Sequence, residues 1–257
     1  MTDGNAGVLI EASDGLMVIT VDRPAVKNAI DYAAAEAIAH ALDRLDTDDT
    51  LSVAIVTGAG GGFCSGMDLS AFLQGSKPSY GDRGFAGMTR RSADKPLIAA
   101  VEGFAVAGGF EMALACDIII AAEGARFALP EVRRGLLAAA GALLRLPRRM
   151  PYHAVMDIAL TGEPVTAERL HTLGIVSRLT APGSALDEAK LVARQIMAGG
   201  PLAVAATKRI LIEQQDWTLD TMWDRQDPLF RSVADSSDAK EGAAAFKERR
   251  PPQWQGQ

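Results

Sequence analysis

Hydrophobic residues at the start of the chain recur in short runs that are typical of β-strands. Apolar runs at residues 8–10 and 17–21 flank a Ser-Asp-Gly sequence at residues 13–15, and this pattern predicts a β-hairpin. Residues 53–57 form a further short apolar run, which predicts a buried strand. The first third of the chain is therefore expected to be rich in strands.

Apolar residues at helical spacing occur between these predicted strands and again later in the chain. Residues 31–46 carry Ala, Leu and Ile at helical intervals, and Asp31 is a suitable N-cap for that helix. The sequence then predicts a strand at 97–101, a turn at Glu102-Gly103, a helix from about Gly108 and a strand at 117–122. A third cycle of the same kind is predicted from Phe127, through helices at 141–149 and 152–160, to a strand at 175–176.

The pattern becomes helical from about Ser184, which is itself a suitable N-cap. The predicted helices cover residues 185–198, 201–215, 218–233 and 237–247. No long polar linker precedes them, so we expect a packed helical extension rather than a tethered module. We predict an α/β spiral core over residues 1–190 and a C-terminal helical region over residues 191–257.

The composition is that of an ordinary globular protein. Of the 257 residues, 48% are hydrophobic and 23% are charged, so the chain can bury a sizeable core. The formal net charge of -6 argues against a general nucleic-acid binder, because phosphate backbones are held by clustered Lys and Arg. We therefore expect no nucleic-acid partner.

Cysteine content and the distribution of acids indicate the compartment. Cys64 and Cys116 are too few for a disulfide framework, which fits a reducing cytoplasm. The most apolar region, residues 97–122, contains Glu102, Glu111 and Asp117, which a membrane span would rarely tolerate. The N-terminal residues lack the basic and apolar parts of a secretory signal. We expect a cytoplasmic protein with no membrane partner.

Two glycine-rich sites carry candidate chemistry. Residues 58–66 fit neither a dinucleotide fingerprint, nor a Walker loop, nor a serine nucleophile elbow, so a flexible turn remains one interpretation. The segment 67–70 after this run is typical of a helix start, and a second glycine pair opens a predicted helix at Gly108. Glycine lets a ligand approach the backbone, and the first N–H groups of a helix lack intrahelical partners. Two such helix starts could form an oxyanion hole.

Two glutamates are candidates for acid–base chemistry. Glu111 lies in an apolar helical segment, and Glu131 follows an apolar approach to a turn. Apolar surroundings raise the pKa of a carboxyl group, which suits proton transfer near neutral pH. The alternative is that each carboxylate pairs with an arginine, for which Arg133 or Arg134 could serve Glu131. The three histidines lie in separate helical contexts without a nearby nucleophile, and we assign them no role.

Taken together, several segments resemble the crotonase (enoyl-CoA hydratase/isomerase) superfamily over almost the whole chain. Their order and spacing are far more specific than any one of them alone. The matching segments are Asp22-Arg23-Pro24-Ala25-Val26-Lys27-Asn28-Ala29, residues 56–69, residues 95–117, Phe127-Ala128-Leu129-Pro130-Glu131-Val132-Arg133-Arg134-Gly135, and residues 241–250.

The resemblance implies a spiral of repeated ββα units and a C-terminal helical region that mediates trimerisation, often as a dimer of trimers. It implies that the N–H groups of Met67 and Gly108 form the oxyanion hole for a coenzyme A thioester. It also implies no metal or redox cofactor, since coenzyme A is part of the substrate. The residues expected to contact coenzyme A are Lys27, Asp68, Leu69 and Arg249.

Glutamate at both acid–base positions is the pattern of the 2-enoyl-CoA hydratases. The resemblance implies that Glu111 deprotonates water for attack on C3 and that Glu131 delivers a proton to C2. After Gly135, however, many hydratases have a Pro-Gly-rich turn, whereas this chain carries leucines and alanines over residues 136–144. These side chains should narrow or reshape the acyl pocket. A carnitinyl-CoA-type dehydratase, an enoyl-CoA isomerase and a non-catalytic acyl-CoA-binding protein are therefore the alternatives.

Overall fold

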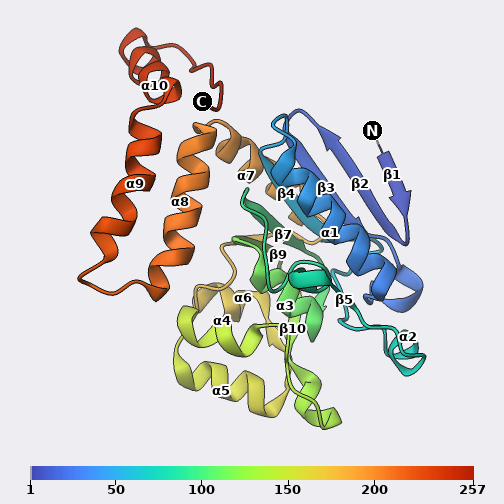
Figure 1. The fold of residues 1–257 in the computed structure, drawn as a ribbon. Helices are drawn as coiled ribbons and strands as arrows, with labels where there is room; N and C mark the ends of the chain where they lie inside the picture. Colours follow the sequence, from blue (N-terminus) through green and yellow to red (C-terminus); the bar gives the residue numbers. More distant parts are fainter. Residues whose placement is uncertain (1) are drawn as a thin grey trace.

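The computed structural model describes residues 2–257, which form a sheet-centred core and a helical extension (Figure 1). The main sheet has the strand order β1-β2-β3-β4-β7-β9-β12, and a smaller sheet has the order β11-β10-β8. The strands are β1 Thr2–Asn5, β2 Val8–Ser13, β3 Leu16–Val21, β4 Val53–Gly58, β5 Ser79–Tyr80, β6 Gly84–Phe85, β7 Leu97–Val101, β8 Phe104–Val106, β9 Ile118–Ala122, β10 Arg126–Ala128, β11 Val165–Thr166 and β12 Arg178–Thr180.

The helices follow the strands in alternation and then dominate the last quarter of the chain. The α-helices are α1 Tyr32–Thr47, α2 Leu69–Leu73, α3 Gly108–Ala115, α4 Ala142–Arg149, α5 Tyr152–Thr161, α6 Ala167–Thr172, α7 Ala185–Met197, α8 Pro201–Glu213, α9 Met222–Ala234 and α10 Ser237–Glu248. Short 3₁₀ helices are η1 Pro24–Val26, η2 Gly81–Arg83, η3 Pro130–Arg134 and η4 Gln214–Asp216.

The core is a spiral in which the turns starting with β7 and β9 each contribute one strand to each sheet before a helix begins. Strand β7 enters the main sheet, and β8 then enters the smaller one before α3 starts. The next turn repeats this with β9 and β10, and β10 pairs in parallel with β8. In the turn that starts with β4, Cys64 forms a parallel bridge to Ala105 of β8. The predicted ββα spiral is thus confirmed.

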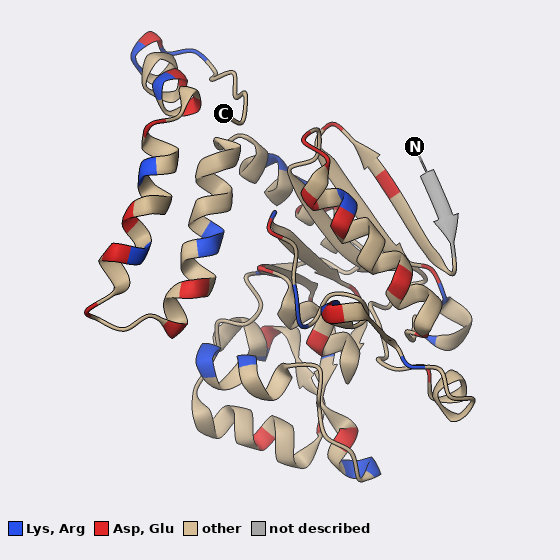
Figure 2. Ribbon diagram, in the orientation of Figure 1, with Lys and Arg blue, Asp and Glu red and all other residues tan. Residues whose placement is uncertain are grey.

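Both faces of the main sheet are buried, which explains why its central strands are apolar without alternation. Because successive side chains of a strand point to opposite faces, each strand serves two clusters. Ile55 and Ile98 pack against α7, whereas Val56 and Ala99 belong to the larger core with α1 and α3. Figure 2 shows β4, β7 and β9 free of charged residues, with the charges on helices and loops.

Local sequence signals located most elements correctly. The hairpin of β2 and β3 and the Asp31 N-cap are confirmed, since the Asp31 carboxylate accepts a hydrogen bond from the Ala34 N–H. The predicted strand at 175–176 is wrong. The backbone N–H groups of Ile175 and Val176 both donate to the Leu170 carbonyl, so they close the end of α6, and the strand begins at Arg178.

The C-terminal helices were predicted at nearly the right places, with α9 beginning later than expected. Helix α7 packs on the main sheet, whereas α8 and α9 extend from the core and α10 lies at the far end (Figure 1). Lys208 of α8 ties this extension to the core, because its ammonium group donates to the Asp117 carboxylate at 2.7 Å and to the Lys95 carbonyl at 2.9 Å. The division of the chain at residue 190 stays a prediction.

Helix α7 is capped by a residue far away in sequence. Ser184 occupies the predicted N-cap position, but its side chain makes no capping hydrogen bond. Instead, the Glu102 carboxylate, in the turn between β7 and β8, accepts hydrogen bonds from Gly183 N–H at 3.0 Å and Ala185 N–H at 2.9 Å. A turn of the spiral therefore fixes the start of α7.

This cap gives a prediction about stability. We expect Glu102→Ala to lower the free energy of unfolding by about 1–2 kcal/mol, because two N–H groups at a helix start lose their acceptor. Ser184→Ala is the matched control and should change stability by less than about 0.5 kcal/mol. Urea unfolding followed by circular dichroism measures both. Equal destabilisation by the two substitutions would contradict the assignment of the cap to Glu102.

Candidate active site

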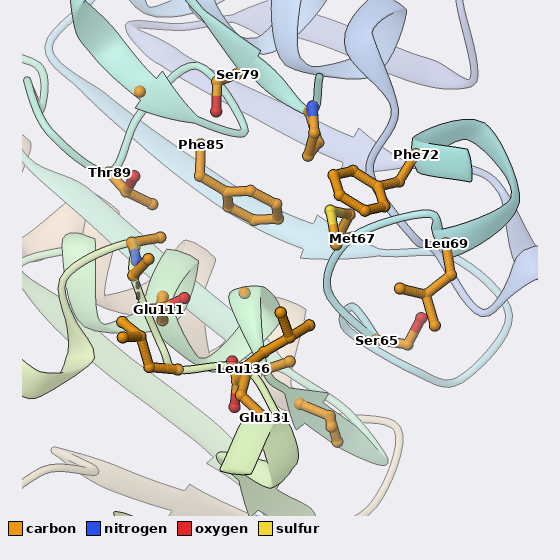
Figure 3. A pocket seen from close by; sticks show the side chains of 18 of the residues that line it. Ser65, Met67, Leu69, Phe72, Ser79, Phe85, Thr89, Glu111, Glu131 and Leu136 are labelled. Carbon is orange, nitrogen blue, oxygen red and sulfur yellow. Dashed lines mark hydrogen bonds between the residues drawn. The ribbon is translucent and has the colours of Figure 1, made fainter. Parts of the chain in front are cut away.

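A cavity of about 1060 Å³ lies where the spiral turns end, and most of the predicted site residues line it. Met67, Gly108 and Glu111 of α3, and Glu131 of η3 come from three separate segments and meet there. Figure 3 shows Glu111 and Glu131 on one side of the cavity, with Met67 and Phe72 across from them. Apolar side chains make up much of the lining around these groups, and a less polar surrounding strengthens electrostatic interactions.

Two glycine-opened segments bring backbone N–H groups together. Gly66 has a φ of 96°, and a Cβ at that position would lie 3.0 Å from the backbone nitrogen of Gly108. Ile30 N–H donates to the Gly66 carbonyl and Asp68 N–H donates to the Ile30 carbonyl, so the N–H of the intervening Met67 faces away from this bridge. Glycine at position 66 is thus required for the close approach of the two segments.

Gly108 supplies the second N–H group. It is the first residue of α3, where a helical N–H has no intrahelical acceptor. The residue before it, Ala107, adopts a φ of 53°, a left-handed conformation that is strained for any residue but glycine. A Cβ on Gly108 would lie 2.4 Å from the ring of Phe85, so the helix start and the aromatic wall pack without room for a side chain. The strain at Ala107 turns the start of α3 toward the cavity.

Glu111 is buried in α3 with a defined set of partners. Its side chain is 3% exposed, and one carboxylate oxygen accepts hydrogen bonds from Ala140 N–H at 2.7 Å and Ala142 N–H at 3.0 Å. Burial, with a smaller effect of the neighbouring Glu131, raises the pKa of Glu111 to about 7, while the two N–H groups and the Arg145 cation act in the opposite direction. The group can therefore exchange a proton near neutral pH.

Glu131 lies in the first turn of η3 with less burial. Burial raises the pKa of its carboxyl group, and the Arg134 cation acts against this shift. Its Oε2 atom is buried and has no hydrogen-bond partner within residues 2–257. Arg133, one of the arginines that could have paired with it, instead contacts Glu163 and the Thr161 carbonyl. The carboxyl group of Glu131 is thus available to a molecule in the cavity.

The residues expected to contact coenzyme A divide into two groups. Lys27 and Leu69 line the cavity. Asp68 is the N-cap of α2, where its carboxylate accepts from Ser70 N–H and Ala71 N–H and contacts Arg23. Arg249 ends α10, away from the cavity (Figure 1). The roles of all four residues in binding stay predictions.

Sequence reasoning missed several residues that the cavity includes. Lys77 and Arg90 add cations to its lining, and Phe85 forms the wall beside Gly108. Thr89 is 2% exposed, and its hydroxyl has no partner in the part of the chain that the structure describes. These residues lie in a segment with little regular structure, so neither hydrophobic period nor motif spacing could have identified them.

The ββα spiral with two glycine-opened segments and two glutamates at one cavity is the architecture of a crotonase-type acyl-CoA enzyme. Residues 11–257 match the family described as enoyl-CoA hydratase/isomerase, and the chain belongs to this family. It is 43% identical, over 94% of its length and 95% of the relative's, to the carnitinyl-CoA dehydratase of Salmonella arizonae.

Solved structures similar to this chain belong to the same class of enzyme but carry two different enzyme names. An enoyl-CoA hydratase from Mycobacterium tuberculosis H37Rv is 52% identical, with a TM-score of 0.96 over 98% of this chain and 100% of the other. A carnitinyl-CoA hydratase from Mycobacterium avium is 36% identical, with a TM-score of 0.78 over 99% of this chain and 100% of the other. The fold and family are therefore established, but the relatives are named for different substrates.

The pKa of Glu111 predicts how stability depends on pH. Folding raises this pKa from 4.5 to about 7, so the stability contributed by the neutral form is full below pH 4.5 and is lost as pH rises through about 7. Glu111→Gln keeps an acceptor oxygen for both N–H groups but cannot ionise. We expect it to be about 2–3 kcal/mol more stable than wild type at pH 8.5 and nearly equal at pH 4.5.

Denaturant unfolding at the two pH values measures this difference, and the titrating groups that do not interact with Glu111 cancel in the comparison. Glu123→Gln, at an exposed position in the turn after β9, provides the matched control and should show no pH-dependent difference. A stability difference for Glu111→Gln that stays constant from pH 4.5 to pH 8.5 would show that Glu111 has an ordinary pKa.

Proposed function

We propose that this protein is an enoyl-CoA hydratase, which adds water reversibly to a 2-enoyl-CoA thioester to give a 3-hydroxyacyl-CoA. The observation that carries the proposal is the meeting of two glutamates with two backbone N–H groups at one cavity. Both glutamates have a raised pKa, caused first by burial. The two carboxyl groups can hold and transfer protons, and the two N–H groups can hold the charge that develops on a thioester oxygen.

The proposed reaction divides the work between these groups. The N–H groups of Met67 and Gly108 hold the thioester oxygen, so C3 becomes electrophilic. The Glu111 carboxylate takes a proton from water as the water oxygen bonds to C3, and the electron pair of the double bond moves into the enolate. Glu131, protonated at the start, donates its proton to C2 as the carbonyl re-forms. Exchange with solvent then returns the proton from Glu111 to Glu131.

The cavity offers positive charge for the nucleotide part of coenzyme A. Lys27 and Lys77 line it, as do the apolar residues Leu69 and Phe72. Ammonium groups bind phosphate as compact point charges, and apolar side chains suit the pantetheine arm. We infer that the thioester enters past these residues, while the acyl group extends toward Glu111, Glu131 and Leu136.

Dehydration of carnitinyl-CoA is the second candidate, because sequence relatives carry that name. The acyl group of carnitinyl-CoA bears a quaternary ammonium, which proteins bind with aromatic cages or acids. Besides Lys27 and Lys77, which are assigned to coenzyme A, the cavity is lined by two cations, Arg90 and Arg134, and by two acids, which the reaction itself uses. Its aromatic residues are Phe72, Phe85 and Phe104, with neither Trp nor Tyr. The charge of the lining therefore supports an uncharged acyl group.

Hydration of crotonyl-CoA tests the proposed activity. We expect wild-type protein to consume the conjugated enoyl thioester absorbance, and Glu111→Gln and Glu131→Gln each to lower kcat by about 10²–10⁴-fold, because each removes a proton-transfer group. The kcat/KM of wild type should rise as pH increases through about 7, since Glu111 must be ionised to accept the proton from water. Glu111→Gln should lose this rise.

Glu163→Gln is a matched control, because Glu163 is exposed and contacts Arg133 outside the cavity. It should leave turnover unchanged. Absence of turnover with crotonyl-CoA and with a medium-chain 2-enoyl-CoA, despite measurable binding of butyryl-CoA, would contradict the hydratase proposal. That outcome would support a non-catalytic acyl-CoA-binding protein. Movement of the double bond without net hydration would instead support an isomerase.

A matched substrate pair distinguishes the hydratase from the carnitinyl-CoA dehydratase. Carnitinyl-CoA and 3-hydroxy-5,5-dimethylhexanoyl-CoA have the same shape and differ only in the charged nitrogen. We expect dehydration of the uncharged compound with a kcat/KM about 100-fold above that of carnitinyl-CoA, because a cationic lining rejects a desolvated cation. Formation of enoyl absorbance measures both. Faster dehydration of carnitinyl-CoA would favour the second candidate.

Other expectations about assembly and setting remain part of the proposal. We infer a homotrimer or homohexamer formed through the C-terminal helices, where large apolar side chains such as Leu219, Trp223 and Phe230 are more than half exposed. Among the described residues, no helix is long and apolar enough to cross a membrane. The cytoplasmic location, the absence of a metal or redox cofactor, and the absence of a nucleic-acid partner remain predictions.

A further inference from the structure

Arg145 of α4 is a half-buried cation that contacts backbone carbonyls rather than a carboxylate. Its guanidinium group donates from Nη1 to the Ala140 carbonyl at 3.3 Å and from Nη2 to the Thr89 carbonyl. Burial lowers the pKa of Arg145, which shows that its charge is held at a cost. Arg145 forms no ion pair with a carboxylate among the described residues. Its two hydrogen bonds alone do not explain why a charged group is kept at this half-buried position.

The two carbonyls belong to separate walls of the cavity. Thr89 lies in the wall formed by the segment after β6, and Ala140 lies in the loop between η3 and α4. The N–H groups of Ala140 and Ala142 in that same loop hold the Glu111 carboxylate at 2.7 and 3.0 Å. Arg145 thus binds the loop from one side while Glu111 is bound from the other.

Gly141 permits this contact. It has a φ of 112°, and a Cβ there would lie 2.0 Å from Nη1 of Arg145. Any other residue at this position would have to displace the guanidinium group or bend the loop away from Glu111. The absence of a side chain at position 141 therefore lets the loop pass between a cation and a carboxylate.

We propose that Arg145 is a positioning residue for Glu111, because its guanidinium group joins the Thr89 and Ala140 carbonyls and so fixes the two N–H groups that hold the carboxylate. The proposal rests on the proposed function, in that Glu111 is the group that accepts the proton from water. It adds that the geometry and the charge of Glu111 depend on a residue that does not touch the substrate.

The electrostatics agree with this geometry. The Arg145 cation lowers the pKa of Glu111, against the effects of burial and of Glu131. Glu131 and Arg145 are the charged groups that face Glu111, and Arg145 in turn faces Arg149 and the thiol of Cys116. Loss of Arg145 removes a cation and loosens two donors. Both changes favour the neutral form of Glu111, so its pKa must rise.

Arg145→Met, Arg145→Lys and Arg149→Met test the proposal through the pH profile of crotonyl-CoA hydration. For Arg145→Met we expect kcat at pH 7 to fall about 100-fold, with the rise in kcat/KM shifted to higher pH. Arg145→Lys keeps the charge but cannot hold two carbonyls in a fixed fork, so we expect kcat lowered about 10-fold with a smaller shift of the pH profile than in Arg145→Met.

Arg149→Met is the matched control one turn further along α4. Arg149 is also partly desolvated, and it donates to the Leu114 carbonyl, remote from Thr89 and Ala140. It should reduce thermal stability without moving the pH profile. An Arg145→Met variant that loses stability but keeps the wild-type pH profile and kcat would overturn the proposal, since Arg145 would then be a structural residue only.

A direct titration separates this proposal from the proposed function. Infrared difference spectra of ¹³C-glutamate-labelled protein, with Glu111→Gln as the reference, report the ionisation of Glu111 without any turnover. A raised pKa in Arg145→Met supports the positioning role even if no enoyl-CoA is hydrated, and an unchanged pKa overturns it even if hydration is rapid. Should Arg145→Met fail to fold, its place is taken by Arg145→Gln with the same readouts.

Discussion

The burial of one ionisable carboxyl group is the constraint on which the rest of the site depends. Glu111 lies in a helix whose other residues are buried and uncharged, where an ionised group is costly unless donors meet it. The chain supplies those donors from the backbone of the loop before α4. Two N–H groups and one nearby cation offset part of the desolvation, and the balance leaves the pKa near neutrality. The site therefore requires this loop to be held in one conformation.

Close approach of backbone segments is the second requirement, and it follows from the spiral. The turns that start with β4, β7 and β9 pass from the main sheet to β8 and its neighbours and then lead to a helix, so these successive turns lie side by side. Gly66 and Gly108 let two of these turns meet, and Ala107 accepts a strained φ of 53° to direct the second. Such strain persists only where the surrounding structure fixes it, as the parallel pairing of β8 and β10 does here.

The sequence predicts best those features whose causes are local. The hairpin at residues 13–15, the Asp31 cap and the helix start at Gly108 each depend on a few neighbouring residues, and the structure has all three. Failures occur where a distant group replaces the local one. Ser184 is a suitable cap in sequence, but its side chain makes no cap, and Glu102 instead accepts from N–H groups at the helix start, 83 residues away in the case of Ala185.

Among the candidate site residues, too, local signals identify some residues, whereas others depend on contacts with distant segments. Glu111 and Glu131 stand out because carboxyl groups within apolar segments are rare, and the structure brings them to one cavity. The carboxylate of Asp68 caps α2 and contacts Arg23, and its expected contact with coenzyme A stays a prediction. Arg145 gave no signal, because an arginine in a helix is ordinary and its two carbonyl partners come from different segments. Only three-dimensional contacts distinguish such residues.

The loop that holds Glu111 also lines the acyl part of the cavity, and this explains how relatives of one family can differ in substrate. The catalytic contact is made by backbone N–H groups, which any residue other than proline can supply. The side chains of the same loop, Leu136 and Leu137 among them, face the cavity and are free to vary. In the proposed enzyme, leucines and alanines in place of a glycine-rich turn would reshape the acyl pocket while the donors to Glu111 remain. Because the chemistry depends on the backbone and the selectivity on its side chains, membership of the family defines the reaction class, and the charge and shape of this lining decide the acyl group.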